Sequence, residues 1–263
     1  MMKREPIEIR VVLFGEFSLS RGERVLAEKD YRSQKMWTVL AYLILNRHRP
    51  VPQTELIEQF WDEEDGQNPT SALKTLIFRL RKLLLPLWND EECQPIVSSW
   101  GAYQWNPEIS CKVDADEFES LLRACEGEET PVSLQLENYR KAMGLYQGEF
   151  LPKNTQSTWH TMRSAYYHMQ YNQAAYRFAL ETQIYAMEQL RKALKNSLRQ
   201  GDVVSQYSGR QFAVMLPSAN YENSLMVCER IEKAFYQKCR RQIAQLRYTV
   251  RALELFNSEG VAL

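Results

Sequence analysis

The sequence predicts a multidomain α+β protein: a mixed N-terminal domain, a helical segment and a smaller mixed domain. Hydrophobic residues alternate in short runs over residues 7–28, which is the pattern of β-strands. They then recur at helical spacing over much of the chain, and alternate again over residues 202–216. A chain of 263 residues is long enough for two or three small domains of this kind.

The composition is ordinary for a folded soluble protein, with 44% hydrophobic and 25% charged residues. The formal net charge of zero excludes a uniformly basic surface but allows a local basic patch. The five cysteines form no CxxC pair and the three histidines fit no zinc-ligand spacing, so we expect reduced thiols and no metal site. Without an apolar run of membrane-spanning length, the protein is expected to be cytoplasmic and not bound to a membrane.

The first domain is predicted from four local signals and from a third helix that is described in the next paragraph. Residues 7–28 read as a small antiparallel meander, and Ser33–Leu45 has the apolar periodicity of a helix. Thr54 is a candidate N-cap for a second helix. Pro95–Trp105 reads as a hairpin with Gly101 in its turn.

Between the second helix and the hairpin, Asn68–Trp88 predicts a third helix, with Asn68 as N-cap and Pro69 in the first turn. One predicted face is apolar: Leu73, Leu76, Ile77, Leu80, Leu84 and Leu87. The opposite face holds Ser71, Lys74, Thr75, Phe78 and Lys82, with Arg79 and Arg81 at its edges. Acidic residues flank this stretch but do not interrupt it, at Asp62–Asp65 and Asp90–Glu92. Such a cationic face suits a phosphate-lined groove, and the alternative is a solvated surface helix.

Strands, three helices and a hairpin in this order make a winged helix. Residues 7–112 resemble the OmpR-type winged-helix DNA-binding domain, and within that group the regulators called SARP, or antibiotic regulatory proteins. The meander and the runs TELIEQFW, LIFRLRKLL and WGAYQW carry the resemblance. It implies double-stranded DNA as partner, with the third helix in the major groove and the wing on the adjacent backbone.

The resemblance implies that residues on the exposed face of the third helix contact DNA. The candidates for base edges are Ser71, Lys74, Thr75 and Phe78. The candidates for phosphate contacts are Arg79, Arg81 and Lys82. Phe78 keeps a second interpretation, in which its ring packs against another subunit.

Residues 113–180 predict three helices, the first beginning after Asp114. The segment resembles the bacterial transcriptional activation domain that follows the winged helix in SARP-class regulators, through Asp116, Phe118, the run LYQGEFLP and Trp159. That family is tetratricopeptide-like and longer than this segment. For the aromatic residues of the third helix we expect core packing rather than ligand binding: Trp159, Tyr166, Tyr167 and Tyr171.

Residues 181–263 predict a helix ended by Gly201, a hairpin over 202–216, a helix over about 222–244 and a strand over Tyr248–Leu255. This order resembles the C-terminal half of a GGDEF domain, the diguanylate cyclase fold. Ser208–Phe212 stands where that family has its Gly-Gly-Asp/Glu-Glu-Phe signature.

The departures from that signature predict a protein without cyclase activity. The two acidic positions are Arg210 and Gln211, which cannot supply the carboxylates that hold metal ions at a triphosphate. The family's first strand and helix are also missing, either because they were lost or because the sequence omits a stretch.

One feature of the GGDEF family is retained. Arg199 and Asp202 have the RxxD spacing that in this family forms the inhibitory site for cyclic di-GMP. An arginine fork and a carboxylate acceptor suit a guanine edge. The alternative is an arginine at the end of its own helix, interacting with the helix dipole.

The sequence therefore predicts a transcriptional regulator with three modules: a winged helix over 1–112, a short tetratricopeptide-like helical segment over 113–180, and a degenerate GGDEF-like sensor or dimerisation domain over 181–263. No cofactor is expected apart from cyclic di-GMP as a ligand, and a homodimer and RNA polymerase are the expected protein partners. The alternative from another class is an active nucleotide cyclase or nucleotidyl transferase with a DNA-binding regulatory half. A helical scaffold that only binds partners is a third possibility.

Overall fold

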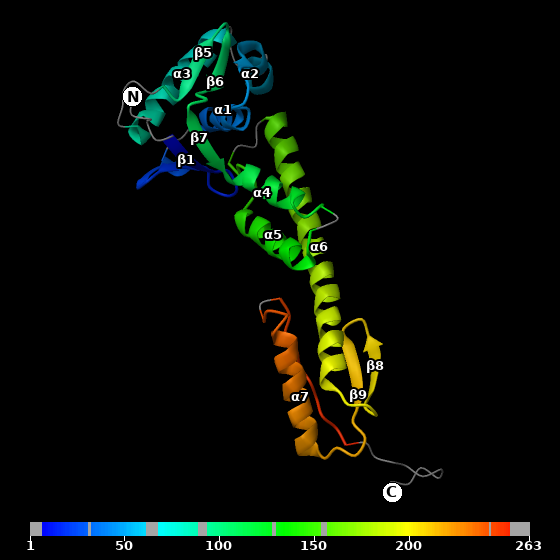
Figure 1. The fold of residues 1–263 in the computed structure, drawn as a ribbon. Helices are drawn as coiled ribbons and strands as arrows, with labels where there is room; N and C mark the ends of the chain where they lie inside the picture. Colours follow the sequence, from blue (N-terminus) through cyan, green and yellow to red (C-terminus); the bar gives the residue numbers. More distant parts are fainter. Residues whose placement is uncertain are drawn as a thin grey trace. The chain divides into compact units, whose positions relative to one another are not determined.

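The computed structural model describes residues 7–30, 33–61, 68–88, 94–127, 130–153, 157–241 and 243–252. The chain divides into two compact units, which we describe separately (Figure 1). The first contains residues up to Thr130 and Glu137–Ala175, and the second contains Pro131–Leu136 and the chain from Tyr176 onward. The acidic runs that flank the third predicted helix lie outside the described residues.

The first unit begins with the predicted antiparallel meander, which the structure confirms. Its strands are β1 (Ile7–Val12), β2 (Ser18–Arg21) and β3 (Arg24–Ala27), followed by the short 3-10 helix η1 (Glu28–Asp30). A fourth strand, β7 (Ile109–Val113), pairs parallel with β1, so the sheet order is β3-β2-β1-β7. The sequence analysis did not predict β7, whose partner lies almost the whole domain away in sequence.

Three helices and a second sheet complete the winged helix. The elements are α1 (Gln34–Leu45), β4 (Val51–Pro52), α2 (Gln53–Phe60), α3 (Pro69–Leu84), η2 (Leu85–Leu87), β5 (Ile96–Ser99) and β6 (Ala102–Trp105). The predicted hairpin is β5–β6, and β4 joins it in the order β4-β6-β5.

The second helix begins two residues earlier than a Thr54 cap requires, so that prediction is wrong. Residues Val51 and Pro52 pair with β6, and the chain enters α2 directly from this strand at Gln53. The first backbone N–H of the helix, that of Gln53, instead donates to the carbonyl oxygen of Gly101 at 3.0 Å. The wing turn thus supplies the acceptor that a capping side chain would otherwise supply.

The helical segment of the chain contains α4 (Asp114–Arg123), α5 (Val132–Leu145) and α6 (Thr158–Ser197). The sequence analysis treated the helices before and after residue 180 as separate elements. They form one continuous helix of 40 residues, because no glycine or proline interrupts residues 158–200. The helix was predicted to end at Gly201, but it ends at Ser197, and Gly201, with φ of +109°, lies in the turn that follows.

Within the first unit, the helical segment is fastened to the winged helix by a short backbone ladder. The N–H of Gly15 donates to the carbonyl of Glu149 at 2.9 Å, and that of Leu151 donates to the carbonyl of Leu13 at 3.0 Å. A Cβ on Gly148 would lie 3.1 Å from the Cα of Gly15, so this close approach of two backbones favours a glycine. The run LYQGEFLP is therefore a seam between the two parts.

Aromatic side chains fill the same seam. The ring of Phe14 lies 4.9–5.4 Å from the rings of Phe118, Tyr146 and Tyr167. Trp159 at the start of α6 packs edge-on against Tyr42 of α1, with ring centroids 5.1 Å apart. Core packing of the predicted aromatic set is confirmed, since Tyr167 is buried and Trp159, Tyr166 and Tyr171 pack against the same core.

Asp114, the first residue of α4, is buried at this seam. Its carboxylate accepts hydrogen bonds from the backbone N–H groups of Leu13 at 2.9 Å, Phe14 at 3.0 Å and Ala115 at 2.8 Å. Burial raises the pKa of Asp114 from 3.8 to about 6, although these N–H donors act in the opposite direction. One side chain thus joins the end of β1 to the start of α4.

The second unit has a small core around the last turns of α6. Its other elements are the hairpin β8 (Val203–Ser208) and β9 (Gln211–Met215) and the helix α7 (Tyr221–Tyr236). The buried residues are Ala193, Leu194, Ile231, Phe235 and Cys239. Phe212 and Val214 on one face of the hairpin pack against this core.

Two predicted elements of this unit differ in the structure. The last helix ends at Tyr236 rather than near Ala244, because the chain turns there and returns Ile243, Ala244 and Leu246 to the core. Tyr248–Ala252, the described part of the predicted strand Tyr248–Leu255, is not a strand. Among the described residues, β8 and β9 pair only with each other, so this segment lacks a partner strand.

None of the helices in the described part of the chain is both long and apolar enough to cross a membrane.

Candidate nucleic-acid interface

The helix α3 is built as its sequence predicts. The side chain of Asn68 caps it, with Oδ1 accepting from the backbone N–H of Ser71 at 3.0 Å, and Pro69 is the first helical residue. The predicted apolar stripe is buried at Leu73, Ile77, Leu80, Leu84 and Leu87 and half-buried at Leu76. Leu83 is buried as well, which widens the stripe.

The opposite face of α3 is exposed to solvent. It presents Ser71, Lys74, Thr75, Phe78, Arg79 and Lys82. Within the described ranges, no acidic side chain forms an ion pair with Lys74, Arg79 or Lys82. We call these six residues the α3 face. It offers hydroxyl groups, one aromatic ring and positive charge that no acidic side chain of the described residues pairs with.

Two contacts within the α3 face orient its uncharged members. The hydroxyl of Thr75 donates to the carbonyl of Ser71 at 3.0 Å, which leaves the oxygen of this hydroxyl as an acceptor. Phe78 keeps 58% of its surface exposed, and the Nζ of Lys82 lies 4.8 Å from the centroid of its ring. The ring is available to either predicted partner, a DNA groove or a second subunit.

Arg81 lies apart from the other candidates and is half-buried. Its Nε donates to the carbonyl oxygen of Ile96 at 2.9 Å, and its Nη2 donates to the hydroxyl of Ser98 at 3.4 Å. Both acceptors belong to β5 of the wing. The structure therefore gives Arg81 a positioning role, holding the wing against α3.

This geometry separates Arg81 from Arg79 experimentally. Arg81→Ala should lower the free energy of unfolding by about 1.5–3 kcal/mol, because the carbonyl of buried Ile96 loses a charged donor. Arg79→Ala should leave stability nearly unchanged and flatten the slope of log affinity for DNA against log salt concentration by about one unit. Urea unfolding and salt-dependent DNA titrations measure the two effects. An Arg81→Ala variant of parental stability with a flattened slope would make Arg81 a phosphate contact, as the sequence suggested.

The wing carries a residue that the sequence analysis did not single out. Its turn consists of Trp100 and Gly101, with φ of +49° and +77°. Gly101 was predicted there, whereas Trp100 occupies a left-handed conformation that a bulky side chain rarely adopts. The indole is fully exposed. The signal in the sequence was a tryptophan before the turn glycine, where asparagine or aspartate is preferred.

The predicted ligand residues of the second unit are close in space through their backbones. The carboxylate of Asp202 accepts from the backbone N–H of Arg199 at 2.8 Å, and the N–H of Asp202 donates to the carbonyl of Arg199 at 3.1 Å. Asp202 thus closes the turn after α6, while Arg199 is exposed. At the hairpin turn, the Nε of Arg210 donates to the side-chain oxygen of Gln183 at 3.1 Å, which ties this turn to α6.

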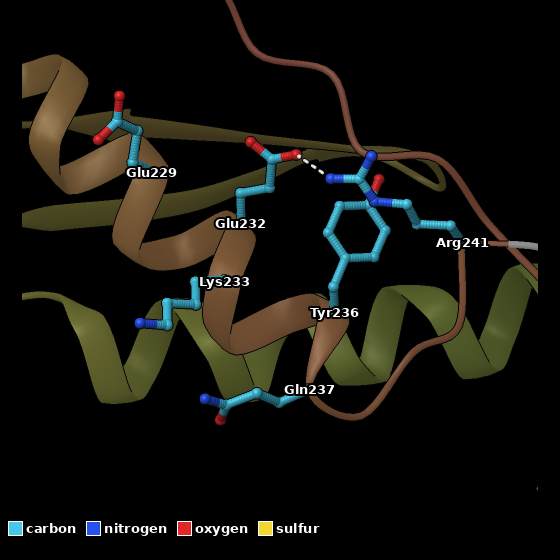
Figure 2. Close-up of a pocket in the computed structure, with 6 residues that line it drawn as sticks. All are labelled: Glu229, Glu232, Lys233, Tyr236, Gln237 and Arg241. Carbon is cyan, nitrogen blue, oxygen red and sulfur yellow. Dashed lines mark hydrogen bonds and ion pairs between the residues drawn. The ribbon is translucent and has the colours of Figure 1, made fainter.

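Figure 2 shows a pocket on α7, lined by Glu229, Glu232, Lys233, Tyr236, Gln237 and Arg241. The Nη2 of Arg241 lies 3.5 Å from Glu232, and its guanidinium lies 4.6 Å from the centroid of the Tyr236 ring. Arg241 and Glu232 are thus paired with each other, and no predicted site residue lies in the lining. The described residues contain no group of three or more histidine, cysteine, aspartate or glutamate side chains that could hold a metal ion.

Comparisons with known proteins bear on the winged helix. Residues 31–102 match the family model described as "Transcriptional regulatory protein, C terminal". Comparison with curated protein sequences gives no match. Among solved structures, the chain is similar to Mycobacterium tuberculosis EmbR in complex with a low-affinity phosphopeptide, with a TM-score of 0.51 and 15% identity over 74% of this chain.

These findings define the class of the N-terminal domain as the winged helix of transcriptional regulatory proteins. The likeness to EmbR concerns the fold, since the identity is only 15%. The chain covers about half of the EmbR chain, 49% of it.

Proposed function

We propose that this chain is a DNA-binding transcriptional regulator of the SARP kind, in which α3 enters the major groove and reads base edges. The observation that carries the proposal is the α3 face, which is exposed and cationic while the other side of the helix is anchored in the core. The transcriptional regulatory family model, which covers this helix, supports it. Lys74 and Phe78 lie where base edges or thymine methyl groups would be met, and Arg79 and Lys82 where phosphates would be met.

The helices α4, α5 and the first part of α6 serve as the activation segment in this proposal. The backbone hydrogen bonds at Gly15 and the buried carboxylate of Asp114 join the winged helix to the part of this segment that belongs to the first unit. A contact on the residues of these helices that belong to the first unit would therefore act on the same compact unit that holds DNA. RNA polymerase is the partner that we propose for this segment, and a homodimer is the proposed state on DNA.

Selection of duplexes from a random double-stranded library tests the DNA-binding proposal with the full chain. We expect enrichment of one sequence and a clear affinity difference between it and random DNA. Equal, weak binding to every duplex would leave only the non-specific electrostatic attraction of a cationic helix and overturn the proposal.

For the second unit we propose a catalytically inactive GGDEF-like module that acts as a sensor of cyclic di-GMP or as a dimerisation element. Arg210 and Gln211 at the hairpin turn offer no carboxylate for a metal ion, and Arg210 is bound to Gln183. Arg199 is exposed, and with Asp202 it offers the two residue types, an arginine fork and a carboxylate acceptor, that suit a guanine edge. The alternative function is an active nucleotide cyclase. Incubation of the protein with GTP and magnesium or manganese tests it, and we expect no cyclic dinucleotide to form.

Arg199→Ala separates a ligand site from a helix-end arginine. If cyclic di-GMP binds here, the variant should lose its binding while keeping the parental melting temperature, because the side chain of Arg199 is exposed. Calorimetric titration and thermal unfolding measure both quantities, with Lys195→Ala, in the last turn of α6, as the control. If the parent protein does not bind cyclic di-GMP at high micromolar concentration, the sensor role is wrong and only the role as a dimerisation element is left.

A further inference from the structure

The wing tip combines two features that seldom occur together. Trp100 is fully exposed to solvent, and its backbone lies in the left-handed region at φ of +49°. A two-residue hairpin turn with both φ angles positive favours Asn-Gly or Asp-Gly, because those residues tolerate the conformation. A tryptophan there weakens the hairpin without adding any packing. Local strain of this kind points to a role outside the fold.

The other tryptophans of the chain serve the core. Trp37, Trp88 and Trp105 are buried, and Trp61 and Trp159 pack against the same hydrophobic core. Among the described residues, Trp100 has no ring contact with another aromatic side chain or with a cation. Its indole is therefore free to meet a ligand.

The strands beneath Trp100 hold it at a fixed place relative to the α3 face. The turn closes β5 and β6, and β4 pairs with the other edge of β6. The N–H of Gln53 holds the carbonyl of Gly101 at 3.0 Å, and Arg81 of α3 holds β5 through the carbonyl of Ile96 at 2.9 Å. A duplex that receives α3 would thus meet the indole at a defined distance along its axis.

We propose that Trp100 is an apolar wedge that enters the minor groove next to the major-groove segment occupied by α3, and packs against deoxyribose and base edges there. This inference rests on the proposed DNA-binding function. Apolar side chains are known to enter the minor groove and to loosen the stacking of the base step that they contact. The residues that precede Trp100 are Ser98 and Ser99, both exposed. A single indole on a polar tip lacks the surrounding apolar patch typical of a protein-binding hot spot, which favours DNA over a protein partner.

The test uses a substitution that should improve the hairpin while removing the wedge. Trp100→Asn places a residue favoured in this turn, so the melting temperature should be equal to or higher than that of the parent. Its affinity for the selected duplex should nevertheless fall, on the order of tenfold. Trp100→Phe should retain most of the affinity. Met162→Gln removes an exposed apolar side chain from α6 and serves as the matched control, with parental affinity expected.

Fluorescence provides a readout independent of affinity. Acrylamide quenches the fluorescence of exposed tryptophans. The part of this quenching that disappears in the Trp100→Phe variant comes from the Trp100 indole, and binding of the selected duplex should reduce that part. If Trp100→Asn binds the selected duplex with parental affinity and DNA leaves the quenching of the parent unchanged, the wedge proposal is wrong. The α3 face is tested separately by Lys74→Ala. A parent that selects no DNA sequence would overturn both the wedge and the proposed function.

Discussion

Lys74→Ala is expected to weaken binding to the selected duplex by about 5- to 150-fold, which corresponds to the 1–3 kcal/mol of one good base contact. Its affinity for random DNA should change far less, so the preference for the selected sequence should shrink. The reason is the position of Lys74 on the N-terminal half of α3, exposed and without an acidic partner among the described residues. Alanine is the best helix former, so the substitution should leave α3 folded.

Titrations of the selected and the random duplex at a fixed salt concentration measure this effect. Lys195→Ala removes the same charge from an exposed position on α6, in the second unit, and should bind both duplexes like the parent. If Lys74→Ala weakens both duplexes equally, Lys74 contacts a phosphate rather than a base. If it changes neither, the α3 face is a solvated surface.

Local signals predicted the parts of the fold that depend on neighbours in sequence. The Asn68 cap, Pro69 and the leucine periodicity all act within one helix, and Gly101 acts within one turn. These elements occur as predicted because each signal and its structural effect are only a few residues apart.

Features that depend on distant contacts could not be predicted in this way. Examples are the parallel pairing of β7 with β1 and the hydrogen bond from Arg81 to the wing. Both join residues that are distant in sequence, and the periodicity of hydrophobic residues does not show which distant residues meet. Residues Tyr248–Ala252 alternate like a strand but have no partner edge among the described residues, so the pattern alone was insufficient. On the candidate site, the sequence placed the α3 face correctly on the exposed side of the helix. It did not show that Arg81 is turned toward β5, or that Trp100 is strained.

Asp114→Ala is expected to have the largest effect on stability, a loss of about 3 kcal/mol or more in the free energy of unfolding. The carboxylate is 7% exposed and accepts from the N–H groups of Leu13, Phe14 and Ala115. Removing it leaves buried donors without an acceptor at the point where β1 meets α4. Urea unfolding of the full chain measures the loss. The matched control is Asp116→Ala, whose side chain is 42% exposed and pairs with Arg47, and which should cost about 0–1 kcal/mol.

The same carboxylate should make the first unit sensitive to pH, in a direction fixed by its raised pKa. Between pH 3.8 and about 6 the folded state keeps a proton that the unfolded chain has lost. The free energy of unfolding should therefore fall as pH rises through this window and level off above pH 6. Because Asp114→Ala lacks the titrating group, the stability difference between parent and variant should narrow over the same range. A difference that widens with pH would mean that the three N–H donors outweigh burial and hold the carboxylate in its charged form.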